Sequence, residues 1–200
     1  ERLAGKEVEL RPLSLDDAEA LVLATSESRE NYRLNNVPNG LEEAEIYIKK
    51  ALSRWEDGKR MPFTVCWKGR VVGSTSYSDL SIWQWPPGSG MQRTDRPDVV
   101  EIGYTWLAAS AQRTRCNTET KYLLLAHAFE AWEVHRVCFR TDERNTRSRN
   151  ALARLGAQLE GVWRADKVSA DGVVRHSAFY SIVREEWPAV KKRLQGFLDK

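Results

Sequence analysis

Residues 99–118 read VVEIGYTWLAASAQRTRCNT and contain three kinds of local structure in succession. Residues 99–107 alternate in polarity and predict a strand. A polar turn at residues 112–117 follows, and Thr118-Glu119 is typical of a helix start. Strict alternation along the strand would place Glu101, Gly103, Thr105 and Leu107 on one face and Ile102, Tyr104 and Trp106 on the other.

The remaining elements follow from hydrophobic spacing and from turn residues. Helices are predicted at residues 14–28, 41–55, 118–134, 145–156 and 187–197. Strands are predicted at residues 8–12, 63–67, 71–77, 99–107, 136–141, 158–168 and 173–183. This order predicts one domain over residues 1–200, of the α/β (α+β) class. We expect a single mixed, mostly antiparallel sheet of about seven strands with helices on both faces.

Composition excludes several classes of protein. A hydrophobic share of 42% and a charged share of 30% are typical of a globular chain and not of a disordered one. No apolar run reaches the roughly 20 residues of a membrane helix, so no membrane partner is expected. Cys66, Cys116 and Cys138 form no CxxC or Cys/His pattern, which argues against a disulfide scaffold, a zinc module or any other metal site. A reducing cytoplasm is the expected location.

The positive charge is concentrated in one part of the chain. The whole sequence has 31 basic and 28 acidic residues, whereas residues 112–156 alone have nine basic and five acidic ones. Such a segment is either a site for a polyanion or a solvated face. Nucleic acid, whose binding would fall steeply with salt, is the less favoured polyanion.

A second informative stretch, residues 141–157, reads TDERNTRSRNALARLGA. Asn145 is a good helix cap, Gly156 a good helix end, and Ala151, Leu152 and Leu155 form an apolar stripe between them. Together the two stretches resemble the GCN5-related N-acetyltransferases (GNAT). Within that superfamily the sequence is most similar to the branch that contains the N-terminal acetyltransferases of ribosomal proteins, and the resemblance covers nearly the whole chain.

The resemblance implies an acyl-CoA, by default acetyl-CoA, as co-substrate, with its diphosphate on the backbone N–H groups of the turn before a helix. Gln112 matches the family pattern, whereas Arg115 and Asn117 stand where the family has glycines. An arginine there can bond phosphate, and asparagine tolerates left-handed dihedrals. The cofactor contacts that the resemblance implies are Trp106, Leu107, Gln112, Arg113, Thr114, Arg115, Cys116, Asn117, Thr118, Asn145 and Ser148.

The resemblance also implies catalytic roles. Asn145 would bond the pantetheine arm and Ser148 would lie near the thioester sulfur, although a helix cap and an ordinary first-turn residue explain both equally. Leu152 stands where many relatives have a tyrosine acid, so Ser148, or a water that it holds, is the candidate proton donor. Glu101 is the candidate base, because an amine must be neutral to attack a thioester. Its alternative role is a bond to a neighbouring strand.

The acceptor is less well defined. Trp83 and Trp85, on a Pro/Gly-rich loop at residues 81–97, either line an acceptor pocket or form a cap or a homodimer contact. His176 is a third candidate for the acceptor cleft. We expect an N-acyltransferase that moves acetyl, or a charged acyl group such as succinyl, to a primary amine of a small molecule or a peptide N-terminus. The alternative is a non-catalytic acyl-CoA sensor or interaction module.

Overall fold

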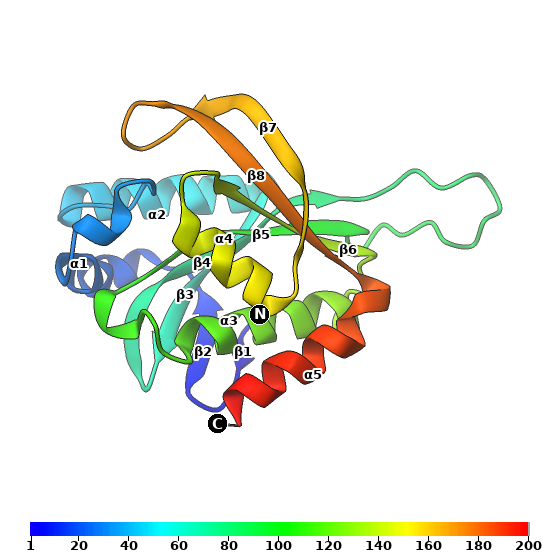
Figure 1. Cartoon of the computed structure of the whole chain (residues 1–200), viewed down its shortest axis with the longest axis horizontal. Helices are drawn as coiled ribbons and strands as arrows, with labels where there is room; N and C mark the ends of the chain where they lie inside the picture. The colour runs from blue at the N-terminus through cyan, green and yellow to red at the C-terminus, as the bar shows by residue number, and fades with distance from the viewer. Residues whose placement is uncertain (200) are drawn as a thin grey trace.

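A computed structural model describes residues 1–199 and shows one eight-stranded sheet in the order β1-β2-β3-β4-β5-β6-β8-β7 (Figure 1). All neighbouring strands are antiparallel except β5 and β6, which are parallel. The strands are β1 (Leu3–Ala4), β2 (Val8–Pro12), β3 (Arg60–Trp67), β4 (Arg70–Ser81), β5 (Val99–Leu107), β6 (Arg136–Asp142), β7 (Gln158–Val168) and β8 (Val174–Val183). The expected α/β class is confirmed, with one strand more than expected because β1 pairs with β2.

Helices cover both faces of the sheet, as predicted. They are α1 (Ala18–Ser26), α2 (Leu41–Glu56), α3 (Cys116–Ala126), α4 (Thr146–Leu155) and α5 (Trp187–Leu198). Helices α1 and α2 pack on each other and on β4 and β3, whereas α3, α4 and α5 pack on the opposite side (Figure 1). We call these two sides the α2 face and the α3 face. Within residues 1–199, no helix is long and apolar enough to cross a membrane.

Two helix predictions need correction at their ends, and one is confirmed in detail. The region predicted as a helix from residue 14 begins with a 3-10 turn, Leu15–Asp17, before α1. The helix predicted from residue 118 starts at Cys116 and ends in a π-helical turn, His127–Ala131. Helix α4 has the predicted caps: the Asn145 side chain accepts a hydrogen bond from the Ser148 N–H, and Gly156 ends the helix with φ 108°.

The central strand β5 contains a bulge that the sequence did not predict. Gly103 pairs with Ser76 of β4 and Trp106 pairs with Ser74, so three steps along β5 oppose two along β4. The extra residue is Tyr104, whose φ of 52° lies in the left-handed region. A bulge of this kind shifts the alternation of every residue after it.

The predicted faces of β5 are therefore wrong beyond Gly103. The Trp106 indole donates to the Tyr47 hydroxyl of α2 over 3.3 Å, so Trp106 lies on the α2 face. Thr105 accepts a 2.7 Å hydrogen bond from Lys121 of α3, so it lies on the α3 face. Glu101, Gly103, Tyr104 and Trp106 share the α2 face, and Ile102, Thr105 and Leu107 share the α3 face.

Strands β5 and β6 separate after a short pairing. Their parallel ladder consists of three pairs and ends at Glu101 and Cys138, after which β5 continues to Leu107 without a partner on this side. The Leu107 carbonyl instead accepts hydrogen bonds from the Tyr32 hydroxyl, over 2.9 Å, and from the Gln112 amide, over 2.7 Å. The sheet is thus open between these two strands, beside the turn that leads into α3.

Candidate active site

The turn before α3 presents a row of free backbone donors. Within residues 1–199, five N–H groups of this turn donate to no acceptor, those of Arg113, Thr114, Arg115, Asn117 and Thr118. They lie at the N-terminal end of α3, where the helix dipole is positive. Free N–H groups at a helix N-terminus form a site for an anion such as a diphosphate.

The missing glycines do not distort this turn. Arg115, at the first glycine position, has ordinary helical dihedrals with φ −71°, and Asn117 lies within α3. The left-handed residue of the turn is Arg113, with φ 58°. The left-handed conformation of Arg113 costs on the order of 1–2 kcal/mol, a cost that a glycine at this position would not have.

Some side chains of the turn are already occupied. The Thr114 hydroxyl accepts from the Cys116 N–H over 3.1 Å, and the Thr118 hydroxyl accepts from Arg154 over 2.7 Å. Cys116 is fully buried, and burial raises the pKa of its thiol to about 12, so its thiol is not a nucleophile at neutral pH. Of the expected cofactor contacts, Cys116 therefore offers neither a free N–H nor a reactive thiol.

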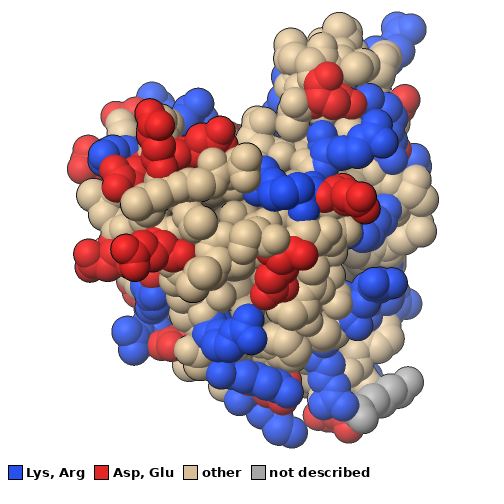
Figure 2. All heavy atoms as spheres, turned by 90° about the vertical axis from the view of Figure 1, so that its left-hand side faces the viewer, with Lys and Arg blue, Asp and Glu red and all other residues tan. Residues whose placement is uncertain are grey.

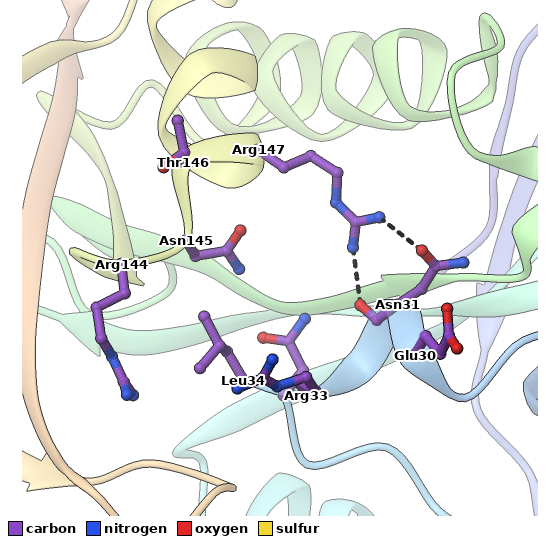
Figure 3. Close-up of a pocket in the computed structure, with 9 residues that line it drawn as sticks. Glu30, Asn31, Arg33, Leu34, Arg144, Asn145, Thr146 and Arg147 are labelled. Carbon is purple, nitrogen blue, oxygen red and sulfur yellow. Dashed lines mark hydrogen bonds between the residues drawn. The ribbon is translucent and has the colours of Figure 1, made fainter.

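A pocket of about 320 Å³ lies between the start of α4 and the segment that joins α1 to α2 (Figure 3). It is lined by Glu30, Asn31, Arg33, Leu34, Asn35 and residues 144–147. Arg147 spans one side of it: its guanidinium donates to the Gln112 amide oxygen over 2.8 Å and to the Asn31 carbonyl over 2.8 Å. Sequence analysis missed Arg147 and Asn31, because nothing in the sequence links positions 116 residues apart.

The same pocket is visible on the molecular surface. Figure 2 shows a notch between the lobe that contains α1 and α2 and the lobe formed by the β7–β8 hairpin, with basic and acidic side chains side by side. Arg144 ties the end of β6 to the β7–β8 hairpin, because it pairs with Asp142 at the end of β6 and with Asp171 between β7 and β8. Its guanidinium lowers the pKa of Asp142 to about 2, so this ion pair persists at any physiological pH.

Asn145 and Ser148 lie at the start of α4, next to this pocket. The Asn145 side-chain oxygen is used as the helix cap, at 3.0 Å from the Ser148 N–H. Its amide nitrogen and the half-buried Ser148 hydroxyl make no hydrogen bond within residues 1–199. Each residue thus combines a structural contact with a polar group that is free for a ligand.

Glu101 sits on the α2 face at the point where β5 and β6 separate. One carboxylate oxygen, Oε2, accepts from Arg140 Nε over 3.1 Å and from Arg140 Nη2 over 2.9 Å. Burial raises the pKa of Glu101 above its usual value, although Arg140 opposes the rise. The other oxygen, Oε1, accepts no hydrogen bond from residues 1–199 and lies only 3.2 Å from where a side chain on Gly103 would begin.

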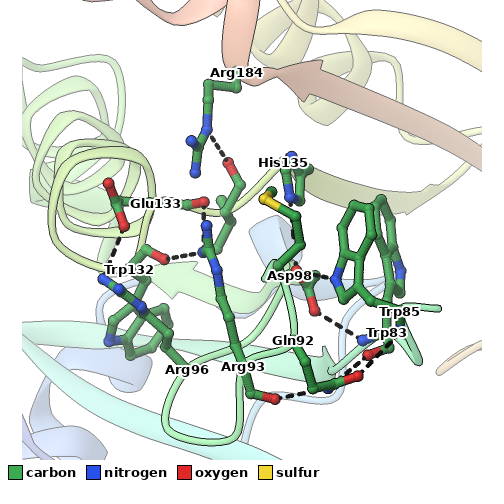
Figure 4. A network of polar contacts seen from close by, with 12 residues as sticks. Trp83, Trp85, Gln92, Arg93, Arg96, Asp98, Trp132, Glu133, His135 and Arg184 are labelled. Atoms are coloured by element: carbon green, nitrogen blue, oxygen red, sulfur yellow. Dashed lines mark hydrogen bonds and ion pairs between the residues drawn. The ribbon is translucent and has the colours of Figure 1, made fainter. Parts of the chain in front are cut away.

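Trp83 and Trp85 belong to an arm, residues 82–98, that extends away from the sheet (Figure 1). Their anchor is the buried Asp98, which accepts from the Trp83 N–H over 2.8 Å and from the Trp85 indole over 3.4 Å (Figure 4). The Trp83 ring also stacks on His135, with centroids 5.2 Å apart. No hydrogen bond or ring contact among residues 1–199 brings either tryptophan to Glu101 or Asn145.

His176 is also separated from Glu101. Phe179 lies under the Arg140 guanidinium and therefore faces the same side as Glu101. Because β8 pairs regularly with β6, alternation places Ser177 on that side and His176 on the opposite one. The structure thus does not bring the three expected acceptor residues together with the candidate base.

The acetyltransferase (GNAT) domain family matches residues 7–158 of this chain. A GCN5-related N-acetyltransferase from Brucella melitensis is 26% identical, with a TM-score of 0.80 over 99% of this chain and 85% of its own. A protein of T. thermophilus described as an acetyltransferase is 33% identical, with a TM-score of 0.78 over 98% and 96% of the two chains. No curated protein matches the sequence at a significant level.

Mycobacterium smegmatis RimJ, solved in complex with CoA-disulfide, is 22% identical, with a TM-score of 0.77 over 94% of this chain and 88% of its own. This likeness is one of fold. The family match covers β2 to β6, the turn before α3 and helices α1 to α4, and it ends where β7 begins. The chain therefore belongs to the GNAT acetyltransferases and is an N-acetyltransferase that uses an acyl-CoA as donor.

Proposed function

We propose that this enzyme transfers an acetyl group from acetyl-CoA directly to a primary amine, with both substrates bound together and Glu101 as the base. The observation that carries this proposal is the free oxygen Oε1 of Glu101, which lies at the opening between β5 and β6. A carboxylate there can accept the proton that an ammonium group must lose before it attacks. The raised pKa of Glu101 brings its basicity closer to that of the amine.

The proposed reaction proceeds in one transfer. The ammonium proton passes to Glu101, directly or through a water, and the neutral nitrogen attacks the thioester carbonyl. The new C–N bond forms and the C–S bond breaks. The nitrogen releases its second proton, which replaces the proton that the leaving thiolate takes up from its donor. Ser148, or a water held by it, is the proposed donor, since its hydroxyl is free and Leu152 cannot supply a proton.

The cofactor site supports this assignment. The free N–H groups of residues 113–118 would hold the diphosphate, and the free amide nitrogen of Asn145 would bond the pantetheine arm. RimJ, which shares this fold, was solved with CoA-disulfide. Arg147 lies between these two groups and would have to yield its bonds to Gln112 and Asn31 if the arm passes there.

Calorimetry with coenzyme A tests the cofactor site through one N–H group. Asn117→Pro removes a free donor in the first turn of α3, where proline is tolerated, whereas Asn117→Ala keeps that donor. A hydrogen bond to a charged group contributes about 1.5–3 kcal/mol, so we expect about 10- to 100-fold weaker binding for the proline variant only. Equal affinities for the two well-folded variants would contradict this placement of the diphosphate.

A catalytically silent acyl-CoA sensor is the second candidate, favoured by Leu152 at the position of the family's tyrosine. Thiol release from acetyl-CoA with a panel of primary amines separates the two functions. We expect amine-dependent thiol release. Tight binding of acetyl-CoA without release on any amine would favour the sensor.

A further inference from the structure

Arg60, the first residue of β3, is a buried cation on the α2 face. Only 3% of its surface is exposed. Its Nε donates to the Ser76 hydroxyl over 2.8 Å and its Nη2 to the Tyr47 hydroxyl over 3.1 Å. The guanidinium carbon lies 3.9 Å from the centre of the Tyr104 ring, the residue at the bulge of β5. These contacts fix the position of the guanidinium but are all neutral.

No carboxylate balances this charge. Within residues 1–199, Arg60 forms no ion pair, and its Nη1 donates no hydrogen bond. Nη1 is not sealed from solvent, so a ligand can reach it. A buried charge without a counter-ion destabilises a fold, and arginine cannot escape the penalty by losing its proton. The structure is therefore arranged to receive an anion at Arg60.

A second group beside Arg60 also lacks a partner. Three alternate serines of β4 face α2, and the first two are used: Ser74 bonds Tyr47 and Ser76 bonds Arg60. The Ser78 hydroxyl is buried, with 2% of the residue exposed, and has no hydrogen-bond partner within residues 1–199. The Ser78 Oγ lies 3.8 Å from the position that a Cβ atom on residue 103 would occupy. The Glu101 Oε1 lies 3.2 Å from the same position.

These groups form one row across the sheet. Arg60 pairs with Ser78 in the β3–β4 ladder, and Ser78 pairs with Glu101 in the β4–β5 ladder. Two strand spacings separate Arg60 from Glu101, about 10 Å between Cα atoms. A cation, a neutral hydroxyl and an unbonded carboxylate oxygen thus follow one another over a distance that a compact molecule can span.

We propose that Arg60 binds the carboxylate of the acceptor, and that the acceptor is an amino-acid-like molecule whose amine lies at Glu101. This inference rests on the proposed function, in which Glu101 takes the proton of the amine. The planar guanidinium suits a carboxylate, and its Nη1 is free to donate. The carboxylate neutralises the buried charge, and the two ends of the molecule are fixed relative to the thioester.

The test compares amino acids with their amides as acceptors for acetyl-CoA. Each pair has the same amine skeleton, and only the acid has a carboxylate. We expect the wild-type enzyme to prefer the acids, and Arg60→Gln to lower the acid-to-amide ratio of kcat/KM at least tenfold. Arg60→Lys, which keeps the charge but loses the planar fork, should give an intermediate ratio. Lys59→Gln removes an exposed neighbouring cation and should leave the ratio unchanged.

Results on the acceptor side and on the donor side would overturn the proposal in this assay. One is a ratio that Arg60→Gln leaves unchanged, or a wild-type enzyme that prefers the amides. The other concerns the donor: if Arg60→Gln specifically lowers the use of succinyl-CoA with an uncharged amine and spares the acid-to-amide ratio, the carboxylate belongs to the acyl group and not to the acceptor.

A binding measurement separates this proposal from the proposed function. In the presence of coenzyme A, N-acetyl amino acids should raise the unfolding temperature of the wild type and of Lys59→Gln, but not that of Arg60→Gln. This result would support the carboxylate site even if no amine releases thiol, in which case only the proposed function fails. No shift for the wild type, or an equal shift for Arg60→Gln, would overturn the carboxylate site.

Discussion

The two faces of the central sheet each bury one cation without an acidic partner among residues 1–199, and the two cations differ in how they tolerate it. Lys121, on the α3 face, has 5% of its surface exposed and one hydrogen bond, to the Thr105 hydroxyl. Burial lowers the pKa of Lys121 to about 7. Arg60, on the α2 face, has 3% of its surface exposed and donates hydrogen bonds only to neutral hydroxyls.

The difference indicates which of the two buried cations is expected to bind a ligand. Lys121 can lose its proton and become a neutral hydrogen-bond partner within the core. Arg60 is held only by the Ser76 and Tyr47 hydroxyls and by the Tyr104 ring, and we propose that an anion from outside the chain neutralises it. In our proposals, the α3 face holds the turn that binds the cofactor, whereas the α2 face carries the groups that bind and deprotonate the acceptor. The predictions below test this division of roles.

The largest effect is expected for Glu101→Gln. Loss of a general base lowers kcat/KM by about 10²- to 10⁴-fold, and the acidic limb of its pH profile should disappear with the carboxylate. Thr105→Val, on the α3 face of the same strand, is the matched control and should change stability without changing kcat/KM. An unchanged rate for Glu101→Gln across the pH range would remove Glu101 as the base.

Lys121→Met should stabilise the protein in a pH-dependent manner. The folded-state pKa of about 7 lies below the value of 10.5 for an unperturbed lysine, so the unfolded chain binds more protons between these values. The free energy of unfolding of the wild type should thus rise as pH increases from about 7 to 10. The lysine penalty at lower pH amounts to as much as about 5 kcal/mol.

Chemical denaturation at pH 6 and pH 10 measures this effect. The stability gain of Lys121→Met over the wild type should be large at pH 6 and small at pH 10. A gain that is the same at both pH values would show that Lys121 keeps its charge in the folded protein, and the contrast with Arg60 would then fail.

Gly103→Ala should lower activity by about an order of magnitude while the fold is retained. The new methyl group would lie 3.2 Å from Glu101 Oε1 and 3.8 Å from Ser78 Oγ, in the space proposed for the acceptor amine. Misplacement of a reacting group by about 1 Å can cost 10²-fold. Gly196→Ala, on the exposed side of α5, is the control and should not affect kcat/KM. Full activity of Gly103→Ala would place the amine elsewhere.

Substitution of Asn145 should have the smallest effect and separates its two roles. Asn145→Ala removes the helix cap, which costs about 1 kcal/mol, and also the free amide. Asn145→Ser keeps a capping oxygen but not the amide. Both should bind coenzyme A about 2- to 10-fold more weakly, and only Asn145→Ala should be less stable. If Asn145→Ser binds coenzyme A normally, Asn145 is a helix cap alone.

The sequence predicted the element order and the polar turn before α3 well. Both depend on local signals: the caps of α4 at Asn145 and Gly156, the hydrophobic spacing of the helices, and the polar turn at residues 112–117. The use of backbone N–H groups for an anion depends little on side-chain identity. The turn thus keeps its free donors although Arg115 and Asn117 replace glycines.

The α2 face could not be predicted in the same way. The bulge at Tyr104 exchanges the faces of later residues, and a tyrosine gives no local sign that it will adopt a left-handed conformation. Arg60 resembles a solvated charge at a strand end until the packing of Tyr47 and Tyr104 around it is known. The one available signal was the alternation of Ser74, Ser76 and Ser78 in a strand that is otherwise buried on that side.

A crystal structure with coenzyme A and an N-acetyl amino acid tests the central claim most directly. The account predicts the diphosphate on the N–H groups of residues 113–118 and the sulfur in the opening between β5 and β6. The amide nitrogen of the product should lie at Glu101 Oε1, with its carboxylate on Arg60. A sulfur on the α3 face, or a product that contacts neither Glu101 nor Arg60, would contradict the account.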